Sequence, residues 1–458
     1  MKRLKIRIKL LMGTTALLFS TYSTAQLPPT SLDVSIIPGS PQHVGNSAVG
    51  NYLSVSCWDG TTPEIYWETP MLSGTIPISE TLDISIQDPD IVAFPGSEKF
   101  CVVYQKGGHI YAELWAPVGL TYSIIEGPIM ISNGKPYNLY PNVDQLENGA
   151  AFVWQQNGEI KGRYWDLTVG GLTTPLALGG EVLISRCFPK VFSTEYTNRE
   201  PDVSVYRSGG QDVANVVFIS YDYDANTENL IIQRLDLDDF YVGLPVNCSE
   251  WSELMPSVAD PYRYNNPRVA SPKIGSAVDF TDCETVVSLT TAGFCGTQQI
   301  IGINGAGATP VYNPILLNNT SDVQYHMNAF PVVSYNECGI IVEWEYSATS
   351  CIIPSFSGNI VLARHLNYSG IPAPPYSAVN SNMFSTMARP AVASRYRTTD
   401  DNIYSTYTDG FFMYQRYSLC TSLFMRKKSI SNQEIEKKSE FSFYPNPAND
   451  NLDIKMIL

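Results

Sequence analysis

The chain has 458 residues, of which 44% are hydrophobic, 12% aromatic and only 16% charged, and its formal net charge is -15. Tyr (28) and Gly (32) are abundant, a balance that favours strands and turns over surface helices. A chain this acidic lacks the clustered Lys and Arg that a phosphate backbone or an anionic membrane surface requires, which excludes nucleic acid as a partner. The length permits one large core or two ordinary ones.

Residues 1–25 have the features of a secretory signal peptide. Five basic residues fall within the first nine, an apolar stretch runs from Leu10 to about Phe19, and small residues lead to Ala25, after which cleavage is expected. The alternative is a membrane anchor, but Gly13 interrupts an apolar stretch that is already shorter than the roughly 20 residues needed to cross a bilayer. No integral membrane span is therefore predicted, and removal of the signal takes the formal charge to about -20.

A unit of constant order recurs along the chain. In the copy from Pro89 to Trp115, a Pro-x-x-Val opening is followed by an apolar strand at 100–105, a turn at Gly107 and Gly108, and an alternating strand at 110–115. The copy from Pro141 to Asp166 repeats this order. Further openings lie at Pro201, Pro267, Pro331 and Pro390, and a weaker first copy begins at Pro41.

Seven copies are counted in this way, and their starts are separated by 48, 52, 60, 66, 64 and 59 residues. Another short apolar run, as at 128–132, 181–185 and 314–318, precedes the next opening, so each copy supplies about four strands. Four-stranded units repeated at this spacing predict an all-β fold, a seven-bladed β-propeller over residues 26–425. Each Pro is expected at the start of its first strand, where a missing N–H does least harm. A pair of β-sandwiches is the alternative fold.

Closure of the ring is predicted to use the N-terminal strand. The run from Leu32 to Ile37 precedes Pro41 as an outer strand would, although no earlier blade exists for it to complete. We expect it to complete the last blade as a latch, because an open ring would expose a strand edge. Residues 418–425 are the competing candidate for the same place.

Nine cysteines are scattered without a Cys-x-x-Cys pair, so a zinc site is not expected. Export makes disulfides possible, and the two local candidates are Cys283 with Cys295 and Cys338 with Cys351, each pair flanking one hairpin. The alternative is that most cysteines are buried small hydrophobic side chains.

One polar cluster suggests a cation. Asp222, Asp224, Asn226 and Glu228 alternate between two paired strands, and alternating oxygen ligands in a turn suit calcium. Thr227, which stands where the helix-loop calcium motif needs Gly, argues against such a site, as does Gln233 at the twelfth position. A solvated hairpin turn is the favoured interpretation, no other cofactor is predicted, and the metal assignment stays open.

No catalytic residue can be named from spacing. The histidines are His43, His109, His326 and His365. None lies in a metal-binding or nucleophile-activating pattern, and no phosphate-binding or dinucleotide-binding motif is present. Carboxylates around a propeller channel lie far apart in sequence and cannot be found by linear spacing. Six tryptophans inside the repeats favour packing between blades over stacking on sugars: Trp58, Trp67, Trp115, Trp154, Trp165 and Trp344.

The end of the chain has a different composition. Residues 426–440 are polar, without strand periodicity, and are predicted to be a flexible linker. The following stretch, FSFYPNPANDNLDI, resembles the start of the C-terminal sorting domain of proteins exported by the type IX secretion system. The resemblance implies passage to the periplasm and then across the outer membrane, with the secretion machinery as partner. Residues 441–458 are expected to be a truncated form of that domain, which would leave the protein periplasmic if the tail does not function.

The repeat itself resembles a pattern of secreted bacterial propeller-like proteins. We therefore expect a secreted or cell-surface protein that binds an extracellular glycan or protein and has no catalytic activity, an adhesion module for example. The alternative is a carbohydrate-active enzyme that uses channel carboxylates. Converging carboxylates in the channel mouth favour the enzyme, and an apolar or aromatic-lined mouth without them favours the binding protein.

Overall fold

The computed structural model describes residues 44–248 with short gaps. Beyond them it describes chiefly strands: one at 32–36, those that lie between 251 and 419, and two at 441–444 and 453–456. Two compact units are formed, Met1–Cys420 and Thr421–Leu458. In the part of the first unit that the structure describes, strands are by far the commonest element, as the sequence predicts. Within the described ranges, no helix has the length and apolar character to cross a membrane.

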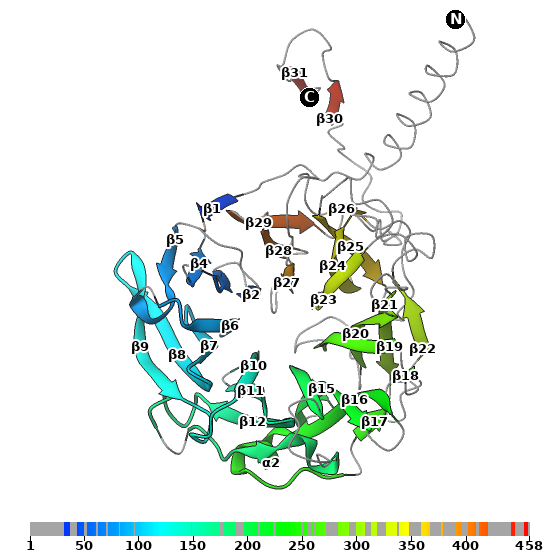
Figure 1. Ribbon diagram of the computed structural model, residues 1–458. Coiled ribbons are helices and arrows are strands. Elements are labelled where there is room, and N and C mark those ends of the chain that lie inside the picture. The colour runs from blue at the N-terminus through cyan, green and yellow to red at the C-terminus, as the bar shows by residue number, and fades with distance from the viewer. Residues whose placement is uncertain are drawn as a thin grey trace, which may run out of the picture. The chain divides into compact units, whose positions relative to one another are not determined.

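The strands of the first unit form antiparallel sheets. In all but the last sheet, chain order runs from the inner to the outer strand (Figure 1). The first sheet contains β2 (Val44–Val49), β3 (Leu53–Trp58), β4 (Glu64–Glu68) and β5 (Ser73–Pro77), and the second contains β6 (Ile86–Ala93), β7 (Phe100–Lys106), β8 (His109–Val118) and β9 (Thr121–Met130). The next contains β10 (Asn138–Leu146), β11 (Gly149–Gln156), β12 (Glu159–Asp166) and β13 (Val182–Leu183), and it is followed by β14 (Asn198–Ser208), β15 (Gln211–Asp222), β16 (Thr227–Asp236) and β17 (Trp251–Glu253), with β18 (Val258–Ala259) also paired to β16. Two further sheets contain β19 (Tyr262–Ala270), β20 (Cys283–Ala292), β21 (Gln299–Ala306) and β22 (Asn313–Leu316), and then β23 (Met327–Asn336), β24 (Gly339–Ser347), β25 (Asn359–Leu366) and β26 (Ser377–Ala378). The last sheet has the order β27 (Ala391–Ser394), β28 (Asn402–Thr408), β29 (Phe412–Leu419) and β1 (Leu32–Ile36).

These sheets lie around a common centre like the blades of a propeller (Figure 1). The predicted latch is confirmed, because β1 pairs antiparallel with β29, with Leu32 opposite Gln415 and Ile36 opposite Phe412. Among the described residues, three short helical segments lie in the connections: η1 (Ile78–Glu80), η2 (Ile184–Cys187) and α2 (Leu237–Val242). The propeller architecture is thus established, and the alternative of two β-sandwiches is wrong.

Tight turns within the blades follow from their sequences. Gly107 and Gly108, between β7 and β8, have φ values of 59° and 77°, and Asn157 and Gly158, between β11 and β12, have 51° and 74°. Two successive residues with positive φ are the requirement of the type I′ hairpin, whose twist matches that of its strands. Glycine and asparagine at these positions therefore fix the hairpins that the repeat pattern predicts.

The core consists of layers between successive sheets. One hydrophobic cluster joins the β2–β5 and β6–β9 sheets, and another joins β6–β9 to β10–β13. Five tryptophans of the repeats belong to clusters that join successive sheets: Trp67, Trp115, Trp154, Trp165 and Trp344. Trp58 packs with Tyr66 and Val44 of its own sheet. All six are buried and are not available to stack on a ligand, and the prediction of packing between blades is confirmed for five of them.

Five of the opening prolines lie inside their strands rather than at the start, which corrects the sequence prediction for Pro89, Pro141, Pro201, Pro267 and Pro331. Pro390 directly precedes β27, as expected. In β6 the register passes from Gln87 opposite Gln105 to Asp90 opposite Val103, so the inner strand carries one extra residue around Pro89. The same one-residue bulge recurs in β10, β14, β19 and β23. A bulge leaves residues unpaired, so proline, which lacks an N–H, is tolerated inside the strand there.

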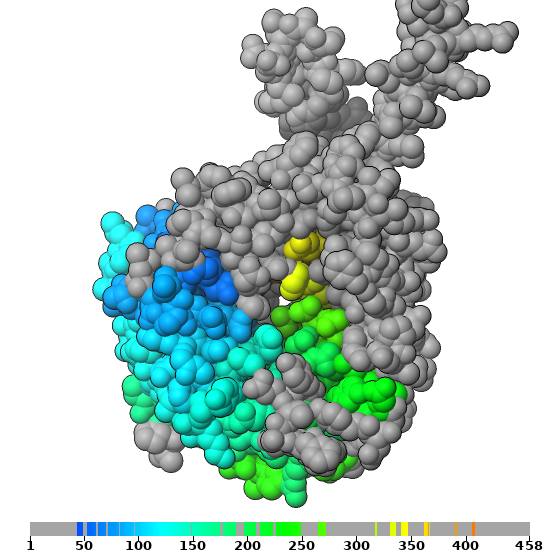
Figure 2. Space-filling model, viewed as in Figure 1, coloured from blue at the N-terminus to red at the C-terminus, as the bar shows by residue number. Residues whose placement is uncertain are grey.

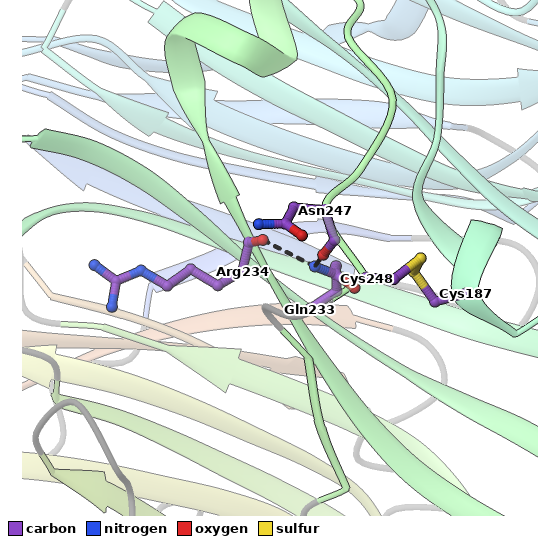
Figure 3. Close-up of a disulfide and its surroundings, with 5 residues drawn as sticks. All are labelled: Cys187, Gln233, Arg234, Asn247 and Cys248. Atoms are coloured by element: carbon purple, nitrogen blue, oxygen red, sulfur yellow. Dashed lines mark hydrogen bonds between the residues drawn. A yellow bond between two sulfur atoms is a disulfide. The ribbon is translucent and has the colours of Figure 1, made fainter.

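The observed disulfide is one that the sequence did not predict. Cys187, at the end of η2, is bonded to Cys248, in the segment after α2, across a sequence separation of 61 (Figure 3). Gln233 Nε2 holds the same segment by donating to the backbone oxygen of Asn247 at 3.3 Å. The bridge therefore links the periphery of two successive sheets. Cys57 and Cys101 are buried free thiols.

The two predicted local disulfides lie outside the described residues in part. Cys295, Cys338 and Cys351 are not described, and only the strand position of Cys283 is known. In the second unit, β30 (Phe441–Tyr444) pairs antiparallel with β31 (Asp453–Met456).

Candidate functional site

A cavity of about 260 Å³ lies at the centre of the first unit, and inner strands of successive sheets line it. Figure 2 shows its opening, bordered by residues of the early sheets in blue and of later sheets in green and yellow. Most of its charged lining comes from the stretch that begins just before each opening proline. These charged residues are Asp88, Asp90, Asp144, Glu200, Asp202 and Arg268. Five carboxylates thus face one guanidinium among the lining residues.

Three of the carboxylates connect neighbouring inner strands. The Val143 N–H donates to Asp90 Oδ2 at 2.9 Å, the Val269 N–H to Asp202 Oδ2 at 2.7 Å, and the Val205 N–H to Asp144 Oδ2 at 2.6 Å. Ser47 Oγ accepts the Ala93 N–H at 3.0 Å in the same way. These bonds hold each side chain in place and leave lone pairs on every carboxylate, because each oxygen can accept two hydrogen bonds.

The pKa values of two of these carboxyl groups are raised toward neutral pH. Burial in the channel wall raises the pKa of Asp90 to about 7, and the charge of Asp202 raises it further against the hydrogen bond from Val143. Burial also raises the pKa of Asp202 to about 6, although Arg268 and the Val269 N–H favour its ionised form. Asp144 adds to the electrostatic cost of ionising Asp202. A cavity whose carboxylates differ in protonation near pH 7 can both donate and accept protons.

The bulges place a further residue of each strand at the cavity. The residue before the proline has a left-handed backbone in all five bulged strands, with φ between 48° and 54°. They are Asp88, Tyr140, Glu200, Asn266 and Phe330, and all line the cavity. None is glycine, so each holds a conformation that costs on the order of 1–3 kcal/mol and that clusters at functional sites.

The cavity also contains a buried hydroxyl. Ser271 lines it, is 2% exposed, and its Oγ has no hydrogen-bond partner among the described residues. Burying a hydroxyl without a partner is costly. This oxygen is therefore suited to a polar group of a bound molecule.

The polar cluster considered for calcium is divided by the fold. Glu228 accepts from Arg199 Nη1, which belongs to the same sheet, and from the Tyr264 N–H of the neighbouring sheet, both at 2.9 Å. Asn226 Oδ1 accepts from the Tyr221 hydroxyl. Asp224 lies outside the described residues, and no group of three or more acidic, His or Cys side chains among those described could hold a metal.

The histidines do not contribute to the cavity as far as they are described. His109 begins β8 and is not among the lining residues. His365 lies in β25, with its side chain undescribed, and His43 and His326 fall outside the described residues.

The channel carboxylates were missed by sequence reasoning. Their spacing along the chain carries no motif, because ring closure alone brings them together. A signal was nevertheless present, since the variable residue that follows the opening proline is Asp in two copies, Asp90 and Asp202. Aligning the copies on proline places both at the same position of the inner strand.

No protein-family model matches the chain, and no curated protein matches it. Among solved structures, it is similar to an α-L-arabinanase from Penicillium chrysogenum complexed with arabinobiose, at 12% identity and a TM-score of 0.41, covering 86% of this chain and 99% of that one. A mutant α-L-arabinofuranosidase from Fusarium graminearum in complex with an iminosugar inhibitor has 10% identity and a TM-score of 0.42, covering 85% and 98%. Oligopeptidase B from Trypanosoma brucei has 11% identity and a TM-score of 0.39, covering 80% and 45%. Values this low carry no conclusion about chemistry.

The non-catalytic binding or adhesion module that the sequence favoured is wrong. That prediction required an apolar or aromatic-lined mouth without converging carboxylates. Instead, Asp90, Asp144 and Asp202 line one cavity, and the ionisation of Asp90 and of Asp202 depends on a neighbouring carboxylate.

Proposed function

We propose that this protein is a glycoside hydrolase whose active site is the central channel. The observation that carries the proposal is the pair Asp90 and Asp202, which line one cavity and interact, with pKa values raised to about 7 and about 6. Glycoside hydrolysis requires two carboxyl groups in different protonation states beside the scissile bond. Raised pKa values of this kind are typical of a carboxylic acid that donates a proton near neutral pH.

The electrostatic surroundings of the two groups support distinct roles. Asp90 holds a proton up to about pH 7 and donates it to the glycosidic oxygen as the bond to the anomeric carbon breaks. Asp202, with the lower pKa and with Arg268 favouring its charge, is the ionised partner that serves as base or nucleophile. Asp144 holds β10 against β14 and adds negative charge near the developing positive charge of the sugar.

The first test is the release of reducing sugar from a panel of neutral polysaccharides and oligosaccharides, including arabino-oligosaccharides. The wild-type protein is compared with Asp90→Asn and with the control Glu126→Gln. The amide of Asp90→Asn keeps an oxygen for the Val143 N–H but cannot supply a proton. Glu126 makes the same kind of inter-sheet bond, accepting the Thr173 N–H at 3.0 Å, outside the cavity. Activity that survives in Asp90→Asn, or is lost equally in the control, contradicts the proposal.

We also propose that the ring has seven blades. Strands β2, β6, β10, β14, β19, β23 and β27 each supply residues to the cavity lining, and each is the inner strand of its own sheet, which supports this count. An experimental density map of the first unit tests it directly, because a ring with five blades would leave two of these sheets outside the channel wall.

We propose further that the protein is exported, with residues 1–25 as signal peptide and residues 441–458 addressing the type IX machinery. The Cys187–Cys248 disulfide supports export, because such bonds persist in oxidising compartments. Cell fractionation of tagged protein with and without residues 441–458 is the test. An extracellular or cell-surface product that depends on the tail is expected, and cytoplasmic full-length protein contradicts the proposal.

A further inference from the structure

The same strained backbone conformation recurs at the mouth of the channel. In five inner strands the extra residue of the bulge precedes the proline, takes a positive φ and contributes to the cavity lining. Packing needs alone do not demand five non-glycine residues in this conformation, since glycine occupies it without steric cost. Each of these positions therefore carries a side chain although glycine would remove the backbone strain.

The chemistry of these side chains suits a sugar ring. We call Asp88, Tyr140, Glu200, Asn266 and Phe330 the rim. Tyr140 is 38% exposed and, with Phe330, supplies an aromatic face that can stack on the apolar side of a ring. Asp88, Glu200 and Asn266 supply acceptors, and in part donors, for hydroxyl groups. Glu200 is held in place, because its Oε2 accepts the Asn266 N–H at 2.6 Å.

The lining of the cavity carries more negative than positive side chains. Its five lining carboxylates outnumber its one lining cation, Arg268, which itself favours the ionised form of Asp202. Arg199 lies 3.3 Å from Glu200 and 2.9 Å from Glu228. One cation thus lies between two carboxylates, and these three side chains carry no excess positive charge. A concave site lined by one sign of charge repels a ligand of the same sign and concentrates neutral or cationic ones.

We propose that the rim selects uncharged sugar rings and rejects sugars that carry a carboxylate, with Tyr140 as the residue that positions the ring over the catalytic pair. The inference rests on the proposed hydrolase function and deepens it by naming the substrate class. The buried Ser271 hydroxyl, which has no partner among the described residues, is an independent sign that a hydroxyl-bearing ligand enters this cavity.

The test uses 4-nitrophenyl glycosides of neutral sugars and of glucuronic acid, with the full chain as enzyme. We expect at least about tenfold lower kcat/KM for the glucuronide, and a smaller difference at high salt, because salt screens partly exposed charges. The combined change Asp88→Asn and Glu200→Gln should narrow the difference. Equal rates, or a preference for the glucuronide, overturn the inference while leaving hydrolysis itself intact.

Tyr140→Ala is expected to raise KM at least about tenfold with little change in kcat, and Tyr140→Phe to restore binding because the ring face is kept. Tyr137→Ala is the matched control: Tyr137 also has a positive φ, 69°, and is 61% exposed, but it does not line the cavity. Should no glycoside be hydrolysed, saturation-transfer NMR with free xylose, arabinose and glucuronic acid still decides. Binding of the neutral sugars that Tyr140→Ala abolishes supports the rim, and no binding or preferred glucuronate binding overturns it.

Discussion

Glu113 joins two sheets through a fully buried carboxylate, and its removal is expected to be among the most destabilising single changes. It lies in β8 with 0% exposure. Its Oε1 accepts from Ser79 Oγ and from the Tyr104 hydroxyl, both at 2.7 Å, and its Oε2 accepts from the Ser79 N–H and from Trp115 Nε1, both at 3.2 Å. Because Ser79 lies in η1, after the preceding sheet, this carboxylate joins successive blades.

The magnitude follows from the donors that lose their acceptor. In Glu113→Ala the two hydroxyl groups can still bond each other, since Ser79 Oγ and Tyr104 Oη are already 2.9 Å apart. The Ser79 N–H and Trp115 Nε1 are left buried without acceptors. At about 1–3 kcal/mol for each such donor, the free energy of unfolding should fall by about 2–6 kcal/mol. Glu113→Gln keeps one acceptor oxygen, so its free energy of unfolding should fall by less.

The pH dependence gives a second and more specific test. Burial raises the pKa of Glu113 above its ordinary value of 4.5 despite its four donors. The folded state therefore holds the proton more tightly than the unfolded state, and this stabilising contribution is complete below about pH 4.5 and is lost as pH rises through the folded pKa. Urea unfolding is followed by tryptophan fluorescence from pH 4 to pH 8. The free energy of unfolding of wild type should exceed that of Glu113→Gln by an amount that becomes smaller as the pH rises. If the difference in free energy of unfolding grew with pH, Glu113 would not be a carboxyl group whose pKa is raised in the folded state.

Three further results are expected. Replacing Cys187 and Cys248 together by Ser should lower the free energy of unfolding by about 4 kcal/mol, because the bond closes a loop of 61 residues, and an unchanged urea midpoint would contradict this. The kcat/KM for glycoside hydrolysis should peak between about pH 6 and pH 7, since activity rises as Asp202 ionises and falls as Asp90 loses its proton; activity rising steadily above pH 8 would exclude these roles. Deleting residues 32–36 should expose the edge of β29, lowering stability and promoting aggregation at raised concentration, as measured by light scattering.

The repeat was readable from sequence because its signals are local. The Gly107–Gly108 turn, the alternating strands beside it and the opening proline all act within one blade. The latch was readable for a related reason: an outer-strand pattern before Pro41 had no blade of its own to complete. The bulge was not readable, since a proline is equally acceptable at a strand start, and only the pairing register separates the two cases.

The site and the disulfide depend on closure of the ring, which linear spacing does not encode. Asp90 and Asp202 are more than a hundred residues apart and come together only because their strands are both innermost. Cys187 and Cys248 meet because one sheet's outer edge lies beside the segment that follows α2. Local reasoning favoured cysteines that flank a single hairpin and therefore overlooked a bond between neighbouring sheets.

The role of Asp90 as proton donor is tested most directly by varying the leaving group. The rates of wild type and Asp90→Asn are compared on a glycoside with an alkyl or sugar leaving group and on the matching 2,4-dinitrophenyl glycoside, whose leaving group needs no proton. We predict a loss of about 10²–10⁴-fold on the first substrate and little loss on the second. Equal losses on both substrates, or no loss on either, would contradict the assignment of the channel as a glycoside hydrolase active site.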